Sequence, residues 1–165
     1  MDIVIRTATP ADLPRLTEIY NHYVVNTPVT FDVEPYTLEG RAAWFAQFAV
    51  AGRHRLLVAE SALGIAGYAG TMRWRAKAAY DTTVETTIYC APEAVGKGIG
   101  IRLYEALFAA LRGEDVHRYV AGYTMPNEAT AKLHARLGFR TVGVFSQVGR
   151  KFGRYWDVCW TERPA

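Results

Sequence analysis

The stretch "PEAVGKGIGIRLYEALFAAL", residues 92–111, decides the fold, and it places glycines at the alternate positions 96, 98 and 100. Glycine loses more backbone freedom on folding than any other residue, so three glycines directly before a helix need a reason. Leucines recur at every fourth position from 103 to 111, which predicts a helix that ends near residue 112. A glycine-rich turn at a helix N-terminus exposes backbone N–H groups beside the positive end of the helix dipole, which suits an anion.

Two common glycine motifs do not fit this stretch. The dinucleotide fingerprint needs a third glycine five residues after the first, where a start at Gly96 meets Ile101 and a start at Gly98 meets Leu103. The phosphate loop of NTPases needs Ser or Thr after Gly-Lys, but Lys97 is followed by glycine. The remaining pattern is G-x-G-x-G with a lysine inside. It indicates either a phosphate-binding loop or only a tight connection between a strand and a helix.

Length and composition are typical of one globular domain, since 50% of the 165 residues are hydrophobic and 21% are charged. A net charge of only +3 suits an anionic small molecule and is far from the basic surface of a nucleic-acid binder. No apolar stretch approaches the ~20 residues that span a bilayer, and the start "MDIVIRTATP" lacks the regions of a signal peptide. We therefore expect a cytoplasmic protein with no nucleic-acid or membrane partner. Cys90 and Cys159 are expected to be reduced, mostly buried thiols.

The apolar periodicity predicts the order β-α-α-β-β-β-α-β-α-β-β, which is an α/β fold with a mixed sheet and helices on both faces. The predicted strands cover 3–8, 55–61, 64–74, 82–90, 118–123, 140–148 and 154–162. The first helix follows Thr9 and stops at Pro28, and a second runs from about 38 to 50 and is closed by Gly52. The last helix starts at its N-cap Asn127 and ends before Gly138.

Two titratable side chains stand out in these elements. Glu85 lies within the strand 82–90, where a charge either points into a cleft or marks an exposed edge strand. His134 lies about two turns into the last helix, where it is either a catalytic group or a packed residue. The residue types alone leave both alternatives open.

The segments "ETTIYC", "VGKGIG" and "NEATAKLHARLGF" together resemble the GNAT superfamily of N-acetyltransferases. The segments "GYAGTMRWRAKAAYDTTVETTIY" and "GRKFGRYWDVCW" resemble its phosphinothricin-type amino-acid acetyltransferases, over essentially the whole chain. The resemblance implies a mostly antiparallel sheet of about seven strands in which the fourth and fifth splay apart, with four helices on both faces. One departure is Val95, where the family usually has Gln or Arg.

The resemblance implies acetyl-CoA as the co-substrate and no metal. Backbone amides of the loop 95–101 would hold its diphosphate, with Lys97 as an added cation, and Asn127 would lie near the pantetheine arm. The arm itself would pair with residues 88–90. The implied coenzyme-binding residues are Ile88, Tyr89, Cys90, Val95, Gly96, Lys97, Gly98, Ile99, Gly100, Ile101 and Asn127.

The implied reaction is direct transfer of the acetyl group to a primary amine, with Cys90 not acting as a nucleophile. An ammonium cannot attack a thioester, so a base must first take its proton, and the resemblance assigns this role to Glu85. An amide near Cys90 would stabilise the oxyanion. His134 takes the place of the family's proton-donating tyrosine, as either a general acid or a structural residue.

The acceptor is expected to be a small amino acid or an analogue such as phosphinothricin or methionine sulfoximine. Basic residues before Glu85 form either a rim that binds a carboxylate or only a solvated loop. The expected acceptor-binding residues are Phe31, Arg73, Arg75, Lys77, Tyr80 and Thr87.

Other functions remain possible on the sequence alone. The acceptor can be a protein N-terminus, a lysine or a polyamine, although a basic rim disfavours a cationic acceptor. The chain can also be a coenzyme A sensor without turnover, a reading to which only Val95 points. The resemblance also implies a homodimer. Lys151, Phe152 and Tyr155 are expected to approach either the active site or the partner subunit.

Overall fold

Seven strands form one sheet in the order β1-β2-β3-β4-β5-β7-β6 in the computed structural model, which describes residues 2–165. The strands are β1 (Val4–Thr7), β2 (Leu56–Ser61), β3 (Gly64–Arg73), β4 (Thr83–Cys90), β5 (Arg118–Thr124), β6 (Arg140–Lys151) and β7 (Arg154–Pro164). The helices are α1 (Leu13–Asn26), α2 (Leu38–Phe45), α3 (Ile99–Ala110) and α4 (Glu128–Arg136). Short 3-10 turns cover Pro10–Asp12, Ala78–Tyr80 and Pro92–Ala94. The predicted order of strands and helices is confirmed.

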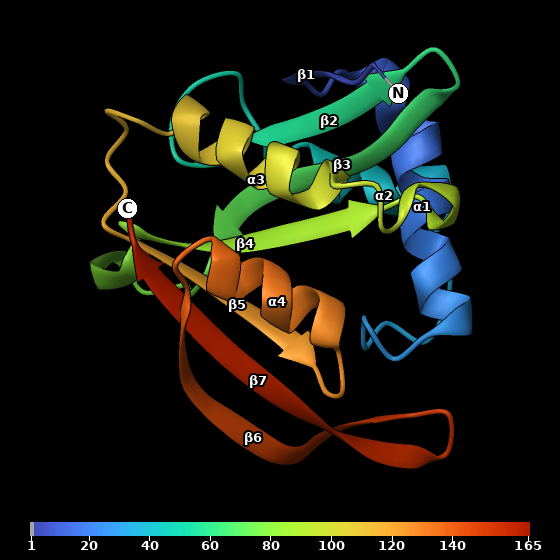
Figure 1. Cartoon of the computed structure of the whole chain (residues 1–165), viewed down its shortest axis with the longest axis vertical. Coiled ribbons are helices and arrows are strands. Elements are labelled where there is room, and N and C mark those ends of the chain that lie inside the picture. The colour runs from blue at the N-terminus through green and yellow to red at the C-terminus, as the bar shows by residue number, and fades with distance from the viewer. Residues whose placement is uncertain (1) are drawn as a thin grey trace.

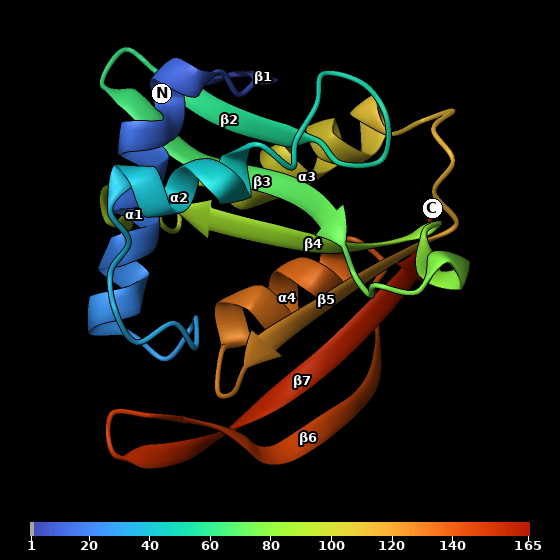
Figure 2. The same ribbon diagram turned by 180° about the vertical axis from the view of Figure 1, so that it is seen from behind.

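The strands β4 and β5 are the only parallel neighbours in this sheet, and they separate soon after they start. Their pairing covers only residues 83–85 of β4 and 118–120 of β5, and every other neighbouring pair is antiparallel. In both views of the ribbon the two strands begin side by side and diverge toward their ends (Figures 1 and 2). The expected splay of the fourth and fifth strands is therefore confirmed.

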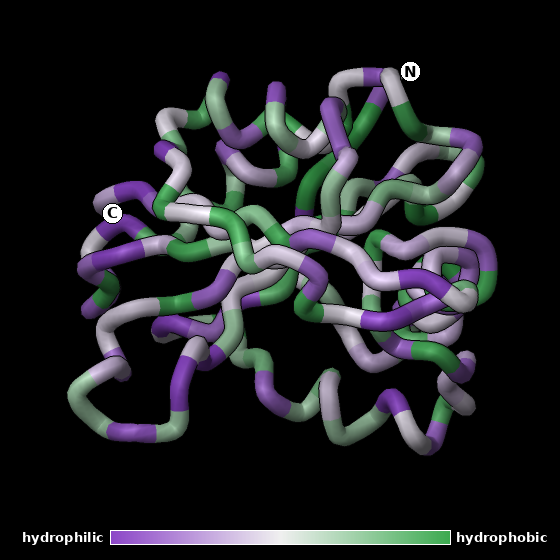
Figure 3. Tube along the Cα trace, turned by 90° about the horizontal axis from the view of Figure 1, so that it is seen from below, coloured by the Kyte–Doolittle hydropathy of each residue, from purple (hydrophilic) through white to green (hydrophobic). Residues whose placement is uncertain are grey.

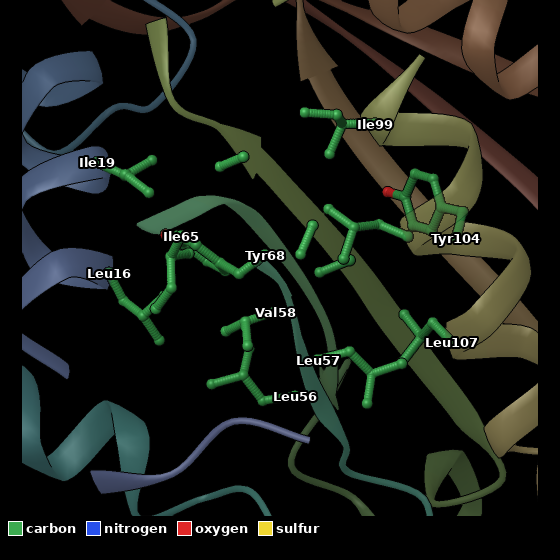
Figure 4. Close-up of a cluster of buried hydrophobic side chains, with 14 of the residues drawn as sticks. Leu16, Ile19, Leu56, Leu57, Val58, Ile65, Tyr68, Ile99, Tyr104 and Leu107 are labelled. Carbon is green, nitrogen blue, oxygen red and sulfur yellow. The ribbon is translucent and has the colours of Figure 1, made fainter. Parts of the chain in front are cut away.

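The helices cover both faces of the sheet. Leu16 and Ile19 of α1 are buried on one face, and Leu107 of α3 is buried on the other, as the close-up of the core shows (Figure 4). Neighbouring residues of β2 pack into the core on opposite faces of the sheet, since Leu57 lies beside Leu107 while Val58 lies on the side of α1 (Figure 4). Burial of one such side chain contributes about 1.5–3 kcal/mol, so the two half-cores hold the sheet between its helix layers.

The predicted boundary signals of α4 are present in the structure. The side-chain oxygen of Asn127 accepts the N–H of Thr130 at 3.0 Å, which satisfies one of the free amides of the first turn. Gly138 follows the helix with φ of +79°, the left-handed conformation that favours glycine. These two residues fix the length of the helix that carries His134.

The second helix is shorter than the sequence predicts, because α2 ends at Phe45 rather than near residue 50. The chain then turns back, and the N–H of Ala49 donates to the carbonyl of His54 at 2.9 Å. The ring of Phe48 packs edge-on against Trp44 with 5.0 Å between ring centroids, and this contact stabilises the turn. Gly52 donates its N–H to Glu114 at 2.8 Å and therefore belongs to a loop, not to a helix end.

Hydrophobic and hydrophilic residues are interspersed along the whole trace rather than gathered in one segment (Figure 3). This distribution follows from strands and helices that each bury only part of their surface. Within residues 2–165, no helix combines the length and the apolar character needed to cross a bilayer.

Candidate active site

A cavity of about 590 Å³ lies where β4 and β5 separate. Glu85, Thr87, Ile88 and Tyr89 of β4 line it, and Ala121, Gly122 and Tyr123 of β5 lie across the gap. Tyr104 of α3 and His134 of α4 reach it from one face of the sheet, and Arg41 and Trp44 of α2 reach it from the other. The cavity therefore connects the two faces of the sheet through the gap between the two strands.

The main chain of β4 turns its amides toward this gap at alternate residues. The N–H of Ala91 donates to Ala66 of the neighbouring chain segment at 2.8 Å, in the register that β4 shares with β3. Because hydrogen bonding alternates along an antiparallel pair, the amides of Ile88 and Cys90 face the side of β5. Pairing with β5 stops at Glu85, so this edge of β4 is open to an extended ligand. The carbonyl of Cys90 accepts the hydroxyl of Tyr23 at 2.6 Å.

The three glycines of the loop have different structural reasons within the chain. Gly96 and Gly98 have φ of +80° and +73°, a conformation that L side chains rarely adopt, and a Cβ at either would meet no atom within 4 Å. Gly100 lies inside α3, where a Cβ would come within 3.3 Å of the Leu133 side chain. Backbone conformation and helix packing therefore explain the alternation.

The first turn of α3 presents free backbone amides, and a Cβ at Gly100 in this turn would lie 3.5 Å from Ile88, which lines the cavity. Gly98 is the N-cap of α3 and has no side chain with which to cap the helix. The amides of Ile99, Gly100 and Ile101 consequently have no partner within the helix. Val95 and Lys97 are exposed, and Ile99 is buried in the core. The loop can therefore bind an anion through its main chain, with a lysine side chain nearby.

Glu85 lies on the same face of the sheet as α1 and α2. Side chains alternate along a strand, and Tyr89 contacts Tyr20 of α1 with 5.1 Å between ring centroids, so Glu85 and Thr87 share that face. The carboxyl group is half-buried, and burial raises its pKa, while the charge of Arg75 lowers it. The raised pKa brings this carboxylate nearer to the range in which a general base works at neutral pH.

His134 is held in one tautomer by a hydrogen-bond chain on the opposite face. Its Nδ1 lies 3.0 Å from the hydroxyl of Thr161, and that hydroxyl donates its only hydrogen to the carbonyl of Ala121 at 3.2 Å. The Thr161 oxygen therefore accepts from Nδ1, and Nε2 keeps a lone pair. Burial lowers the pKa of His134 to about 4, so the ring is neutral near pH 7. This arrangement favours the structural alternative over a general acid.

The basic residues of the β3–β4 connection lie outside the cavity lining. Arg73 donates to the carbonyl of Ala76 at 2.6 Å and to Asp81 at 3.0 Å. Arg75 and Tyr80 both lie against Trp74, the guanidinium at 5.0 Å and the tyrosine ring at 5.2 Å from the indole ring. Lys77 is exposed. Of the predicted acceptor-binding residues, only Thr87 lines the cavity.

Phe31 and Lys151 join the loop after α1 to the β6–β7 hairpin. The ring of Phe31 lies directly against Gly149, at a place where a Cβ would overlap it, and Phe31 does not line the cavity. The ammonium of Lys151 donates to the carbonyl of Thr30 at 2.7 Å and is buried. Lys151 is therefore a contact within the chain, whereas Phe152 and Tyr155, which follow it, are exposed.

A group that sequence analysis missed lines the cavity on the side of α1 and α2. Arg41 of α2 is buried between the rings of Tyr20 and Trp44. The signal was available, because Arg41 and Trp44 are three residues apart and so share one face of a helix that must pack against the sheet. A charged residue at a core-facing position indicates a function.

A splayed pair of parallel strands beside an uncapped glycine loop defines an enzyme of the acetyltransferase class. The family model for the acetyltransferase (GNAT) domain matches residues 5–160, and the chain belongs to this family. Two curated relatives are similar over nearly their full length. The phosphinothricin N-acetyltransferase of Streptomyces coelicolor is 54% identical, covering 99% of this chain and 96% of the relative. The L-methionine sulfoximine/L-methionine sulfone acetyltransferase of Pseudomonas aeruginosa PAO1 is 39% identical, covering 96% and 92%.

Two solved structures have the same fold as this chain. A GNAT superfamily phosphinothricin acetyltransferase from Sinorhizobium meliloti in complex with AcCoA has a TM-score of 0.91 at 32% identity, covering 99% of this chain and 89% of that chain. A putative acetyltransferase from Salmonella typhimurium with its cofactor acetyl-CoA has a TM-score of 0.90 at 34% identity, covering 98% and 93%. The resemblance to GNAT acetyltransferases stated from the sequence is confirmed.

Proposed function

We propose that this enzyme transfers the acetyl group of acetyl-CoA to the amine of a small amino acid of the phosphinothricin or methionine sulfoximine type. The observation that carries the proposal is the cavity through the sheet, which Glu85 lines from one face and which Tyr104 of α3 and His134 of α4 line from the other. The names of the relatives support the same substrate class. Two substrates that enter from opposite faces can then meet between β4 and β5.

The residues present fit the coenzyme. The amides of the first turn of α3 and the charge of Lys97 suit a diphosphate. The open edge of β4 at Ile88 and Cys90 suits the amide groups of the pantetheine arm, because an extended ligand can pair with a free strand edge. Asn127 lines the same cavity, although its side-chain oxygen already caps α4. Val95, which is exposed, adds only an apolar side chain to this site.

The chemistry assigned to the chain begins with proton removal. Glu85 accepts a proton from the acceptor's ammonium group, directly or through a water molecule, and the free amine attacks the thioester carbonyl. A new N–C bond forms, the attacking nitrogen loses its second proton to water, and the C–S bond breaks. The departing thiolate takes a proton from water, so the products are an N-acetyl amino acid and the coenzyme thiol. The Cys90 amide faces the gap and can donate to the oxyanion of the tetrahedral intermediate. Burial raises the pKa of the Cys90 thiol to about 11, which argues against covalent catalysis by this residue.

His134 is proposed to line the coenzyme side of the gap without donating a proton. Its neutral ring has a bare Nε2, which can accept a hydrogen bond from an N–H group or from water. A cationic acceptor such as a polyamine is disfavoured, because Arg41 already places one buried positive charge in the cavity. A coenzyme sensor without turnover would have no use for a half-buried carboxylate at Glu85.

We also propose a homodimer that forms through β6, with the cytoplasm as the expected location. β6 is the outer strand of the sheet, and one of its edges is unpaired. An unpaired edge with apolar side chains is a template for a second copy of the chain. The exposed apolar residues of β6 and the hairpin are Val142, Val144, Phe145, Val148, Phe152 and Tyr155.

A thiol-release assay tests the proposed activity. Purified protein with acetyl-CoA is offered phosphinothricin, L-methionine sulfoximine, L-methionine sulfone, ordinary L-amino acids, a lysine peptide and spermidine. The proposal expects the highest kcat/KM among the first three compounds. A higher kcat/KM for spermidine or the lysine peptide than for every amino acid would replace the proposed acceptor class. If no compound causes release of the thiol, the enzyme assignment is contradicted.

A further inference from the structure

Arg41 is held as a flat cation between two aromatic faces. Its guanidinium carbon lies 3.9 Å from the ring centroid of Tyr20 and 3.7 Å from that of Trp44. The residue is only 5% exposed, and it lines the cavity. Aromatic faces stabilise a cation that lies over them, but they leave the edge of the guanidinium, with its N–H groups, without acceptors.

The N–H groups of Arg41 are largely unpaired within residues 2–165. The guanidinium has five N–H donors, and the one hydrogen bond found for it is a long one of 3.5 Å from Nη2 to the hydroxyl of Tyr68. Its Nε is buried without a partner, and no described carboxylate lies within ion-pair distance of it. Asp32, which also lines the cavity, instead accepts the hydroxyl of Tyr20 at 2.5 Å.

A buried guanidinium without acceptors is costly to the folded protein. Its retention at this position is explained if a ligand supplies the missing oxygen atoms. Guanidinium groups bind carboxylate, phosphinate and similar oxyanions through two parallel N–H···O bonds, which the free edge of Arg41 can offer.

We propose that Arg41 is the specificity-determining residue of this enzyme and binds an oxyanion of the acceptor. The inference rests on the proposed function and names what selects its substrate class. The acceptor, not the coenzyme, is the partner, because Arg41 shares the α1–α2 face with Glu85 and Tyr89. The free amides of α3, which suit the diphosphate, lie on the other face. The oxyanion is either the α-carboxylate or an anionic group at the end of the acceptor's side chain.

Four acceptors separate the two sources of the oxyanion. Phosphinothricin carries both anions, and L-methionine sulfone carries only the carboxylate. The decarboxylated analogue 3-aminopropyl(methyl)phosphinate carries only the phosphinate, and 3-(methylsulfonyl)propylamine carries neither. Kinetic constants of wild type and Arg41→Gln are measured for each compound at saturating acetyl-CoA. The amine without an oxyanion serves as the internal reference.

The substitution Arg41→Gln is expected to raise KM about 10- to 100-fold for acceptors whose oxyanion binds Arg41 and to change kcat less. For 3-(methylsulfonyl)propylamine the change in kcat/KM is expected to stay within about 3-fold. A loss for L-methionine sulfone but not for the decarboxylated phosphinate assigns the carboxylate to Arg41, and the reverse pattern assigns the phosphinate. Arg41→Lys keeps the charge without the planar fork and is expected to recover only part of the loss.

Control measurements keep the result interpretable if the variant is less stable. Arg55 is a half-buried arginine with Glu114 at 3.5 Å, and it does not line the cavity, so Arg55→Gln is expected to keep wild-type constants for all four acceptors. The melting temperature and the affinity for acetyl-CoA are measured on each variant. Equal losses with all four acceptors, or no loss with any, would overturn the role of Arg41. Failure of the wild type to use any of them would instead refute the proposed function.

Discussion

Glu85 and His134 line one cavity from opposite faces of the same sheet. Glu85 projects from β4 on the side of α1 and α2, and His134 reaches the cavity from α4. The two side chains can approach a common space only because β4 and β5 part after residue 85 of β4. The splay of the strands is therefore the feature that turns a closed sheet into a site for two substrates.

Glu85→Gln is expected to lower kcat/KM by about 10²- to 10⁴-fold, because the amide cannot accept the acceptor's proton. Burial raises the pKa of Glu85, so ionisation of this carboxyl group destabilises the folded state. The stability that the protonated group contributes is therefore lost as pH rises through its folded pKa. The variant should therefore melt at a higher temperature than wild type at pH 7 to 8, as differential scanning calorimetry can measure. Normal turnover across this pH range would remove Glu85 as the base.

His134 is expected to be neutral, with the proton on Nδ1, at pH 7. NMR of the ring nitrogens can observe this tautomer and a titration near pH 4. Because the folded pKa lies below the ordinary value, His134 contributes stability above about pH 6.5 that is lost as pH falls toward 4. The loss in the free energy of unfolding across this pH range is at most about 3 kcal/mol. A proton on Nε2 at neutral pH would restore the general-acid role.

Gly98→Ala is expected to cost about 1 kcal/mol of stability, because alanine is strained at positive φ. The same change should weaken acetyl-CoA binding about 10-fold or more by displacing the first amides of α3. Gly113 has φ of +83° and equally open surroundings, and it lies outside the main cavity, so Gly113→Ala is the matched control. Isothermal titration calorimetry that finds equal affinities for both variants would contradict the phosphate-binding loop.

Arg75→Gln combined with Lys77→Gln is expected to raise the acceptor KM by less than about 5-fold, because exposed charges are screened by solvent. Loss of the Arg75 charge should also raise the pKa of Glu85, since that charge lowers it. The acid limb of the pH profile of kcat/KM should therefore move to higher pH. If the acid limb of the pH profile stays in place while KM rises strongly, both residues contact the acceptor directly.

Val144→Glu is expected to convert the proposed dimer into a monomer, because a charge at the unpaired edge of β6 disfavours a second copy. Val50 is similarly exposed on a loop far along the chain from β6, so Val50→Glu is the control. Light scattering after size-exclusion chromatography measures the mass. A monomeric wild type, or a Val144→Glu variant that remains a dimer, would refute this interface.

The sequence predicts most of the architecture because local signals and tertiary packing agree there. Asn127 and Gly138 mark both ends of α4, and the alternation of β4 places Glu85 on one face. The end of α2 could not be predicted from the sequence, because the contact between Phe48 and Trp44 determines it and no capping residue marks it.

The proposed acceptor end of the site was harder to predict than the proposed coenzyme end. The proposed role of the glycine loop needs only main-chain amides at the start of α3, which the position of the loop along the sequence predicts. The neighbours of Arg41, by contrast, come from α1, α2 and β3, and only the folded chain brings them together. Phe31 was expected at the acceptor, but the approach of the β6–β7 hairpin holds its ring against Gly149.

A crystal structure of the protein with coenzyme A and the best acceptor tests the central claim most directly. The account predicts diphosphate oxygens about 3 Å from the amides at the start of α3. It also predicts the acceptor amine in the gap between β4 and β5, on the side of Glu85 and within reach of its carboxylate through at most one water molecule. A diphosphate bound elsewhere, or an acceptor amine on the side of α3 and α4, would contradict it.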